Sequence, residues 1–296
     1  MIRRALIASA FALTLAACGG STPPTQPPPS GNPPPPANQD PPANARPTVD
    51  SIAVQGRRPK QPARFADVRE IVDVTATVRD PETPIEELVY QWTATVGTFT
   101  GTGRVVTWTA PDSVSEPNGT TVTITLKVIE NFGYPGQAKT FSHDTTSTVT
   151  LSLHDSVKEV GEMSSRFLTE FSKPQINRDW RDVMKDFNRD ACPVKAEYDE
   201  ERQSVEHHIA NYVMNTFSIG VANVRLGFGG TCDFALPGDA CSSARVMWDS
   251  KGPNGGVSRG TDYLTAVYSA TNSRWWLCSS RYIPDSTADR SFYSGR

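Results

Sequence analysis

The first half of the chain alternates apolar and polar residues, and this period of two is typical of β-strands. Turn residues, chiefly Pro, Gly, Asn and Asp, separate the alternating runs. The predicted strands are Thr48–Val54, Ile71–Asp80, Leu88–Gly97, Arg104–Pro111, Thr120–Glu130 and Ser147–Leu153. A series of about seven short strands without an intervening helix predicts an all-β antiparallel sandwich over residues 48–153.

From residue 154 the apolar residues first follow helical spacing and later return to a period of two. Helices are predicted over residues 157–171, 176–187 and 194–208, and strands over residues 211–228, 243–250, 263–270 and 274–283. Helices followed by an antiparallel sheet are typical of an α+β domain, here residues 154–284. Residues 285–296 are predicted to form a flexible tail, and the chain as a whole is predicted to be multidomain.

The first 17 residues have the features of a secretory leader. Arg3 and Arg4 precede an apolar run of about a dozen residues, which is too short for a transmembrane helix. The leader ends in Leu15-Ala16-Ala17-Cys18, which resembles the lipobox of bacterial lipoproteins. The resemblance implies that Cys18 is acylated, palmitate included, and that the protein is anchored in the cell outer membrane, facing the periplasm or the cell surface. The alternative is an ordinary cleaved leader followed by a chance cysteine.

Residues 18–47 combine the cysteine with a proline-rich segment that cannot bury a core. Half of the chain's 24 prolines lie between Ser21 and Pro47. Such a segment favours an extended, disordered tether, because proline-dense chain spans about 3.1 Å per residue. A docking site for a partner domain is the alternative interpretation.

The sandwich segment also carries an ordered set of aromatic motifs. Tyr90-x-Trp92, Gly97-x-Phe99, Val106-x-Trp108-x-Ala110-Pro111 and the alternating run that ends at Gly133 follow one another in that order. The set resembles bacterial Ig-like and PKD-like domains. The resemblance implies that Trp92 lies in the core between the sheets and that the domain is a spacer or an adhesive module.

The second half resembles the NTF2-like or SnoaL-like cone fold in its layout, a helical hairpin followed by a curved sheet that ends in "RWWLCSSRYI". The resemblance implies a pocket between the helices and the sheet. Enzymatic members use this pocket for acid–base chemistry or for ligand binding, and many other members are non-catalytic.

The candidate catalytic residues in this half are Asp262, Tyr263 and His207, because a buried Asp or His beside a Tyr can act as base and oxyanion donor. Further titratable candidates are Asp179, Asp182, Asp186, Tyr198 and His208. Asp182 and Asp186 are spaced as on the solvated face of a helix. Adjacent His207 and His208 point in different directions, which disfavours a metal site, and no cofactor is predicted.

The four cysteines beyond the leader are predicted to form two disulfides, because an exported protein meets an oxidising compartment. Cys232 and Cys241 bracket a Pro-Gly turn and are predicted to pair, which leaves Cys192 with Cys278. Four cysteines permit three pairings, and zinc is a rival that the lack of any C-x-x-C motif disfavours.

The last predicted strand contains Trp275 and Trp276, which alternation places on opposite faces. Cys278 shares a face with Trp276, and that face is predicted to pack towards the helices. Trp275 is predicted to be either second-layer packing or an exposed contact.

Charge and layout together favour a binding function. Without Arg3 and Arg4 the chain has 27 Lys and Arg against 32 Asp and Glu, a net charge of −5, and it contains no basic tract. Nucleic-acid binding is therefore disfavoured. The sequence predicts a non-catalytic binding, adhesive or envelope-organising lipoprotein with a protein or glycan partner. The alternatives are a small-molecule-binding protein or acid–base enzyme and a passive spacer.

Overall fold

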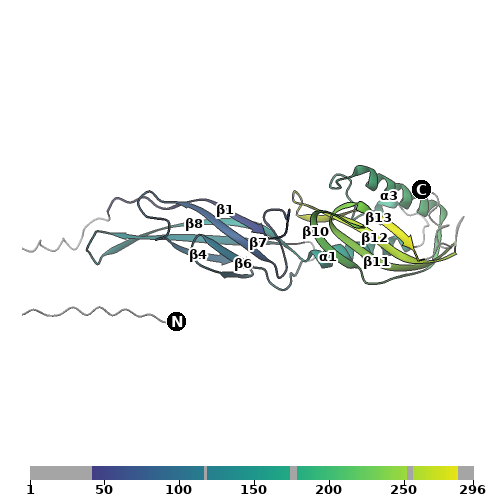
Figure 1. The fold of residues 1–296 in the computed structure, drawn as a ribbon, viewed down its shortest axis with the longest axis horizontal. Helices are drawn as coiled ribbons and strands as arrows, with labels where there is room; N and C mark the ends of the chain where they lie inside the picture. Colours follow the sequence, from purple (N-terminus) through teal and green to yellow (C-terminus); the bar gives the residue numbers. More distant parts are fainter. Residues whose placement is uncertain (1–41, 117–118, 174–178, 252–255, 286–296) are drawn as a thin grey trace, which may run out of the picture. The chain divides into compact units, whose positions relative to one another are not determined.

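The computed structural model describes residues 42–116, 119–173, 179–251 and 256–285, and Figure 1 shows their fold. The leader, Cys18, most of the tether and residues 286–296 of the predicted tail lie outside the described residues. The described chain is mostly β, with several sheets of which one is curled. We call residues 42–154 the sandwich region and residues 155–285 the curled-sheet region.

The sandwich region consists of two four-stranded sheets, with strand orders β1-β3-β6-β5 and β2-β8-β7-β4. The strands are β1 (Thr48–Gly56), β2 (Phe65–Asp67), β3 (Ile71–Arg79), β4 (Val89–Ala94), β5 (Thr98–Thr100), β6 (Val105–Thr109), β7 (Thr120–Gly133) and β8 (Thr140–His154). Seven of the eight are joined by antiparallel pairs, but β2 pairs with β8 in parallel, so the expectation of a purely antiparallel sandwich is wrong at this edge.

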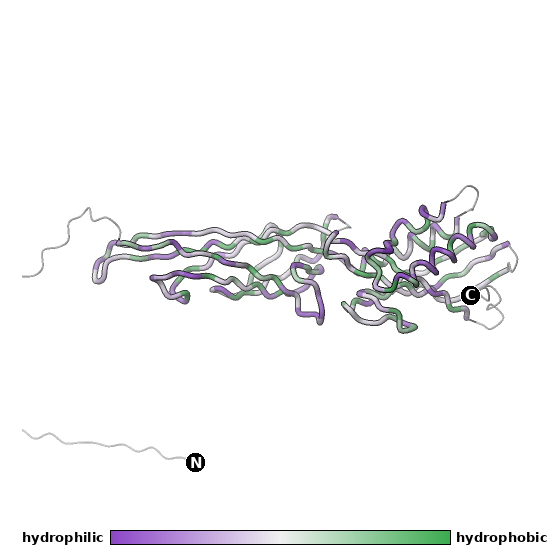
Figure 2. Tube along the Cα trace, turned by 90° about the horizontal axis from the view of Figure 1, so that it is seen from above, coloured by the Kyte–Doolittle hydropathy of each residue, from purple (hydrophilic) through white to green (hydrophobic). Residues whose placement is uncertain are grey.

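Alternation along the strands supplies the core between these two sheets. In β3, Val72, Val74, Ala76 and Val78 are buried while the residues between them are exposed, and Figure 2 shows the same alternation of hydropathy along the strands. Their side chains join those of β7 and β8 in one hydrophobic cluster. Burial of such a cluster, at about 25 cal/mol per Å² of apolar surface, holds the two sheets together.

Two details of the sandwich region differ from the sequence-based expectation. β8 starts at Thr140, seven residues earlier than predicted, because its polar Thr- and Ser-rich beginning continues the antiparallel ladder with β7 beyond the core. The completely buried tryptophan is Trp108, whereas Trp92 is half-buried at the margin of the core, where it contacts Phe99 and donates a hydrogen bond to the carbonyl of Gly103.

The curled-sheet region begins with helices and ends with a five-stranded sheet. Its elements are α1 (Ser156–Ser172), α2 (Trp180–Val183), α3 (Lys195–Asn211), β9 (Val213–Ile219), β10 (Asn223–Thr231), a 3-10 turn (Asp233–Ala235), β11 (Pro237–Lys251), β12 (Gly256–Ser269) and β13 (Arg274–Pro284). The sheet order is β10-β11-β12-β13, and β9 pairs with the second half of β11, so the predicted single strand 211–228 is in fact two strands.

The first and third predicted helices are confirmed, but the second is not. α1 starts where the Asp155 carboxylate accepts a hydrogen bond from the Lys158 amide, which satisfies one of the free amides of the first turn. Between Asp179 and Phe187, only the four residues of α2 are helical. The predicted helix ends early because the chain turns so that Phe187 bridges to Leu277 at the edge of β13.

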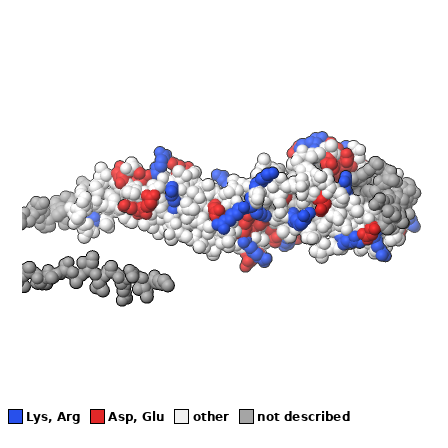
Figure 3. Space-filling model, viewed as in Figure 1, with Lys and Arg blue, Asp and Glu red and all other residues white. Residues whose placement is uncertain are grey.

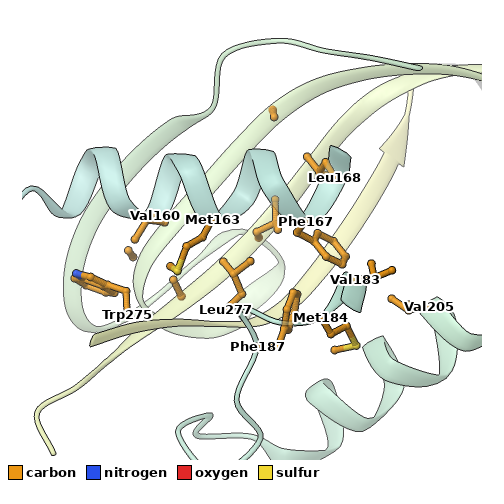
Figure 4. Close-up of a cluster of buried hydrophobic side chains, with 14 of the residues drawn as sticks. Val160, Met163, Phe167, Leu168, Val183, Met184, Phe187, Val205, Trp275 and Leu277 are labelled. Carbon is orange, nitrogen blue, oxygen red and sulfur yellow. The ribbon is translucent and has the colours of Figure 1, made fainter. Parts of the chain in front are cut away.

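Side chains of α1, α2, α3 and the sheet form one close-packed cluster (Figure 4). Val160 and Met163 of α1 point towards Trp275 and Leu277 of β13, and the ring of Phe167 points towards Val183 and Phe187. Trp275 is buried and donates a hydrogen bond to the hydroxyl of Ser156, while Trp276 lies on the other face beneath the guanidinium of Arg274. The prediction is therefore wrong for Trp275, which packs against α1, because both faces of this strand are apolar and alternation does not distinguish them. The face with Trp276 and Cys278 packs beside Tyr198 of α3, as predicted for that face.

Candidate functional site

The predicted catalytic residues lie apart from one another. Asp262 is buried on β12, opposite Tyr282 of β13, on the face that carries the core residue Leu264. Tyr263 points to the opposite face and its ring contacts Phe234. His207 is exposed on α3 and contacts the side chain of Asn211. The described contacts therefore do not bring Asp262, Tyr263 and His207 into one site.

The space expected to be a substrate pocket in the curled sheet is occupied by side chains. Phe167 and Phe187 contact each other with ring centroids 4.9 Å apart, and Met184 and Val205 complete the packing between the helices (Figure 4). Interiors packed in this way reach the density of organic crystals, so a ligand enters only if side chains move.

The cysteines are paired as the sequence predicts. Cys192 is bonded to Cys278 and Cys232 to Cys241, with Cα–Cα distances of 5.5 and 5.4 Å. The first disulfide attaches the segment before α3 to β13, and the second closes the loop between β10 and β11. The lipidation site Cys18 lies outside the described residues.

The acidic residues around α2 differ in environment. Asp179 caps α2, and hydrogen bonds from the backbone and side chain of Arg181 lower the pKa of its carboxyl. Asp186 is buried instead of solvated, because the chain has left the helix before this residue. Its two carboxylate oxygens lie 3.0 Å from Arg166 and 3.3 Å from Arg274. The expectation of a solvated face is therefore wrong at Asp186, which links α1 to β13.

His208 and Tyr198 are also structural in their surroundings. The His208 ring stacks between Phe171 and Tyr212, and its Nε2 atom has no hydrogen-bond partner among the described residues. Burial lowers the pKa of His208 to about 4, and the neighbouring His207 adds a smaller effect in the same direction. Burial raises the pKa of Tyr198, which packs beside Phe187 and the Cys192–Cys278 disulfide.

A groove of about 730 Å³ lies along the side of α1 that faces away from the core. Gly161 and Ser165 line it at a spacing of one helical turn, and so do Val221 and Ala222 from the turn between β9 and β10. Charged side chains of both signs also line it, namely Lys158, Glu162, Arg166 and Glu170. Basic and acidic side chains are likewise interspersed over the face that Figure 3 shows.

A cluster of polar side chains lies where β8 leads into α1. Its residues are not among the candidate site residues that the sequence suggests. The Ser152 hydroxyl lies 2.7 Å from Nε2 of His154, and Nδ1 of His154 lies 2.9 Å from the carboxylate of Glu159. The Tyr268 hydroxyl lies 3.3 Å from the same Nε2 atom. His154 is completely buried, Glu159 is buried and Ser152 is half-buried. We call Ser152, His154, Glu159 and Tyr268 the junction cluster.

The sequence holds only a weak signal for the junction cluster. Ser152 and His154 are two residues apart and thus share a face of β8, and Glu159 follows one helical turn after the N-cap of α1. Tyr268 is more than a hundred residues away, and only the fold brings it to them.

Apolar and polar contacts surround the junction cluster. The ring of Phe65 stacks on that of His154 and contacts the rings of Tyr268 and Trp275. The carboxylate of Asp67 accepts hydrogen bonds from the amide and hydroxyl of Ser156. These contacts join residues of the sandwich region to residues of the curled-sheet region.

Comparisons with protein-family models, with curated proteins and with solved structures each find no match. No helix in the described part of the chain is long and apolar enough to cross a lipid bilayer. Within the same residues, no three His, Cys, Asp or Glu side chains are grouped so that they could hold a metal ion.

Proposed function

We propose that the protein is a lipid-anchored lipoprotein of the cell envelope whose folded regions act by binding rather than through chemistry inside the curled sheet. The order of leader, lipobox cysteine and proline-rich tether supports the anchor. Firm attachment requires more than one acyl chain, and acylated lipobox cysteines carry several. In this proposal the sandwich region is Ig-like or PKD-like and serves as spacer or adhesive module, and the curled-sheet region is NTF2-like.

The observation that carries the binding role is the packed interior of the curled sheet. Where related layouts have a pocket, this chain has Phe167, Phe187 and Trp275 in one cluster. The groove along α1 is a recess of the described residues that can receive a partner. Its small lining residues leave room for an extended chain, and its charged lining residues offer ion pairs and hydrogen bonds to a protein or glycan at the envelope.

The anchor is tested by labelling cells that express the protein with a palmitate analogue. We expect the unmodified chain to incorporate the label and to fractionate with the outer membrane. Cys18→Ser is expected to lose the label and to leave the membrane fraction. Equal labelling of both chains, or a labelled chain in the inner membrane, contradicts this part of the proposal.

The groove is tested by photo-crosslinking in intact cells. A photoreactive residue at Ser165 in the groove is compared with one at Ser51, which is exposed on β1 of the sandwich region. We expect a discrete adduct from position 165 that is absent from position 51. Gly161→Arg should abolish this adduct by placing a large side chain in the groove. The same adducts at both positions, or an adduct that survives Gly161→Arg, contradict the proposed contact.

A further inference from the structure

The junction cluster has the connectivity of a nucleophile, a general base and a residue that orients the base. Ser152 and Glu159 bind opposite nitrogens of the His154 imidazole, at Nε2 and Nδ1. A carboxylate at Nδ1 holds the proton on that nitrogen, which leaves Nε2 free to accept the proton of the serine hydroxyl. Both distances lie within hydrogen-bond reach, so the pair Ser152–His154 meets the geometric requirement for an activated serine.

Aromatic rings and a glycine pack around the imidazole of His154 and hold it in place. The ring of Phe65 stacks on the imidazole at a centroid distance of 5.2 Å, and the Tyr268 ring contacts Phe65 at 4.6 Å. Gly119 lies close to the same ring: a Cβ at this position would lie 2.5 Å from Cε1 of His154, and the φ of Gly119 is +92°. A larger residue at position 119 would therefore displace the imidazole.

Ser152 and Tyr268 supply the groups that a reacting carbonyl needs. Ser152 is half-buried, and its hydroxyl lies 2.7 Å from Nε2 of His154. Its own amide donates to the carbonyl of Arg64 and is thus occupied. The Tyr268 hydroxyl is the nearest side-chain donor to Nε2 of His154 after Ser152, and burial raises the pKa of this hydroxyl, which keeps it protonated. Tyrosine hydroxyls are among the donors that stabilise oxyanions.

We propose that Ser152, His154, Glu159 and Tyr268 form a hydrolytic site for small carboxylic esters. In the first step the Ser152 oxygen attacks the ester carbonyl carbon while its proton moves to Nε2 of His154. The carbon–oxygen bond to the alcohol then breaks, and the proton on Nε2 passes to the departing alkoxide. Water attacks the acyl–serine ester in the same way, which releases the carboxylic acid and restores Ser152. Tyr268 donates a hydrogen bond to the carbonyl oxygen in both steps, and Glu159 positions His154.

The test uses the full chain in detergent and two probes, a fluorophosphonate and p-nitrophenyl acetate. We expect the fluorophosphonate to form an adduct that mass spectrometry locates on Ser152. Ser152→Ala should abolish the adduct and the ester hydrolysis above background. Ser147→Ala is the matched control, since Ser147 lies on the same strand and is also half-buried, and it should retain both signals.

Glu159→Gln tests the positioning role. It should lower the rate of ester hydrolysis by about 10²- to 10⁴-fold. The loss should appear in kcat with KM nearly unchanged, because Glu159 contacts the imidazole and not the ester. Glu159→Asp, which keeps a carboxylate, should recover part of the rate, whereas a merely structural role would leave the two variants equally impaired.

Two results overturn the proposal: a wild-type chain that forms no Ser152 adduct, and an adduct or activity that persists in Ser152→Ala. If Ser152→Ala does not fold, the position of the adduct in the wild-type chain decides. A negative result leaves the binding function intact, because neither the anchor nor the groove along α1 involves Ser152.

Discussion

The sandwich region and the curled-sheet region are stabilised by different means. The sandwich region contains no cysteine from Thr48 to Leu153, and its core consists chiefly of alternating β-branched residues and leucines from two sheets. The curled-sheet region contains two disulfides, a buried carboxylate between two arginines, and a core that mixes aromatic and methionine side chains. Alternation along single strands therefore predicts the core of the sandwich region, whereas the curled-sheet region also depends on cross-links and ion pairs that no local pattern shows.

The largest expected effect comes from the Cys192–Cys278 disulfide, whose partners are 86 residues apart. The double variant Cys192→Ser/Cys278→Ser should lower the free energy of unfolding of the curled-sheet region by about 4–5 kcal/mol, since closing a long loop restricts the unfolded chain most. Urea unfolding followed by near-ultraviolet circular dichroism measures this. A sandwich transition that moves equally would show that the two regions unfold as one and would break the comparison.

In the sandwich region the largest loss of stability is expected from Trp108. This side chain is completely buried and donates a hydrogen bond to the carbonyl of Val96. Trp108→Ala should cost about 3–5 kcal/mol in the free energy of unfolding, as expected for an aromatic side chain removed from a core. Trp92→Ala is the control and should cost less than half as much, because Trp92 lies at the margin of the core. Equal costs in chemical denaturation would contradict this assignment.

His208 should make the curled-sheet region sensitive to acid. Its pKa is lowered to about 4 in the folded chain, against about 6.5 when unfolded. Between these pH values only the unfolded chain binds the proton, so stability is full above about pH 6.5 and falls as the pH drops towards 4. The loss from this group is at most about 3 kcal/mol, since the side chain retains some contact with solvent.

Unfolding experiments across this pH range, on variants of His208 and of its neighbour His207, test this expectation. His208→Phe should flatten the pH dependence of the curled-sheet transition, whereas His207→Phe, at the exposed neighbour, should leave it in place. A slope that His208→Phe does not change would assign the acid sensitivity to other groups.

The smallest expected effect comes from the Cys232–Cys241 disulfide, whose partners are nine residues apart. Cys232→Ser/Cys241→Ser should lower the free energy of unfolding by about 2–3 kcal/mol, because a short loop loses less entropy on closure. Mild reduction should also open this disulfide without unfolding the core, since it closes only the turn between β10 and β11. A loss as large as that for Cys192–Cys278 would contradict the loop-length argument.

The sequence predicts helices and strands better than it predicts which of them pack against one another. Alternation and helical spacing identify most strands and both long helices, because these patterns follow from which side chains face a core. The second predicted helix fails because Phe187 bridges to Leu277 of β13, a long-range contact that helical spacing cannot reveal. The disulfide pairing is predicted correctly, because the Pro-Gly turn favours one local pair and leaves the other two cysteines.

The candidate site residues likewise depend on long-range contacts that the sequence does not reveal. Asp262 and Tyr263 are adjacent in the sequence, yet neighbouring strand residues face opposite sides of a sheet, so adjacency argues against a shared site. His207 is on a helix that presents it to solvent. The junction cluster combines residues from a strand, a helix and a distant strand, and only the folded chain places Tyr268 beside His154.

Phe65 belongs by sequence to the sandwich region, yet its side chain is part of the core of the curled-sheet region, between His154, Phe228 and Trp275. A fragment that starts at residue 154 would leave those aromatic rings open to water and prone to aggregation. If either half were exchanged for a half from another protein, the new protein would need an aromatic side chain that packs as Phe65 does. We therefore do not expect the two regions to occur as separate, exchangeable domains. A shortened chain for crystallisation should retain both.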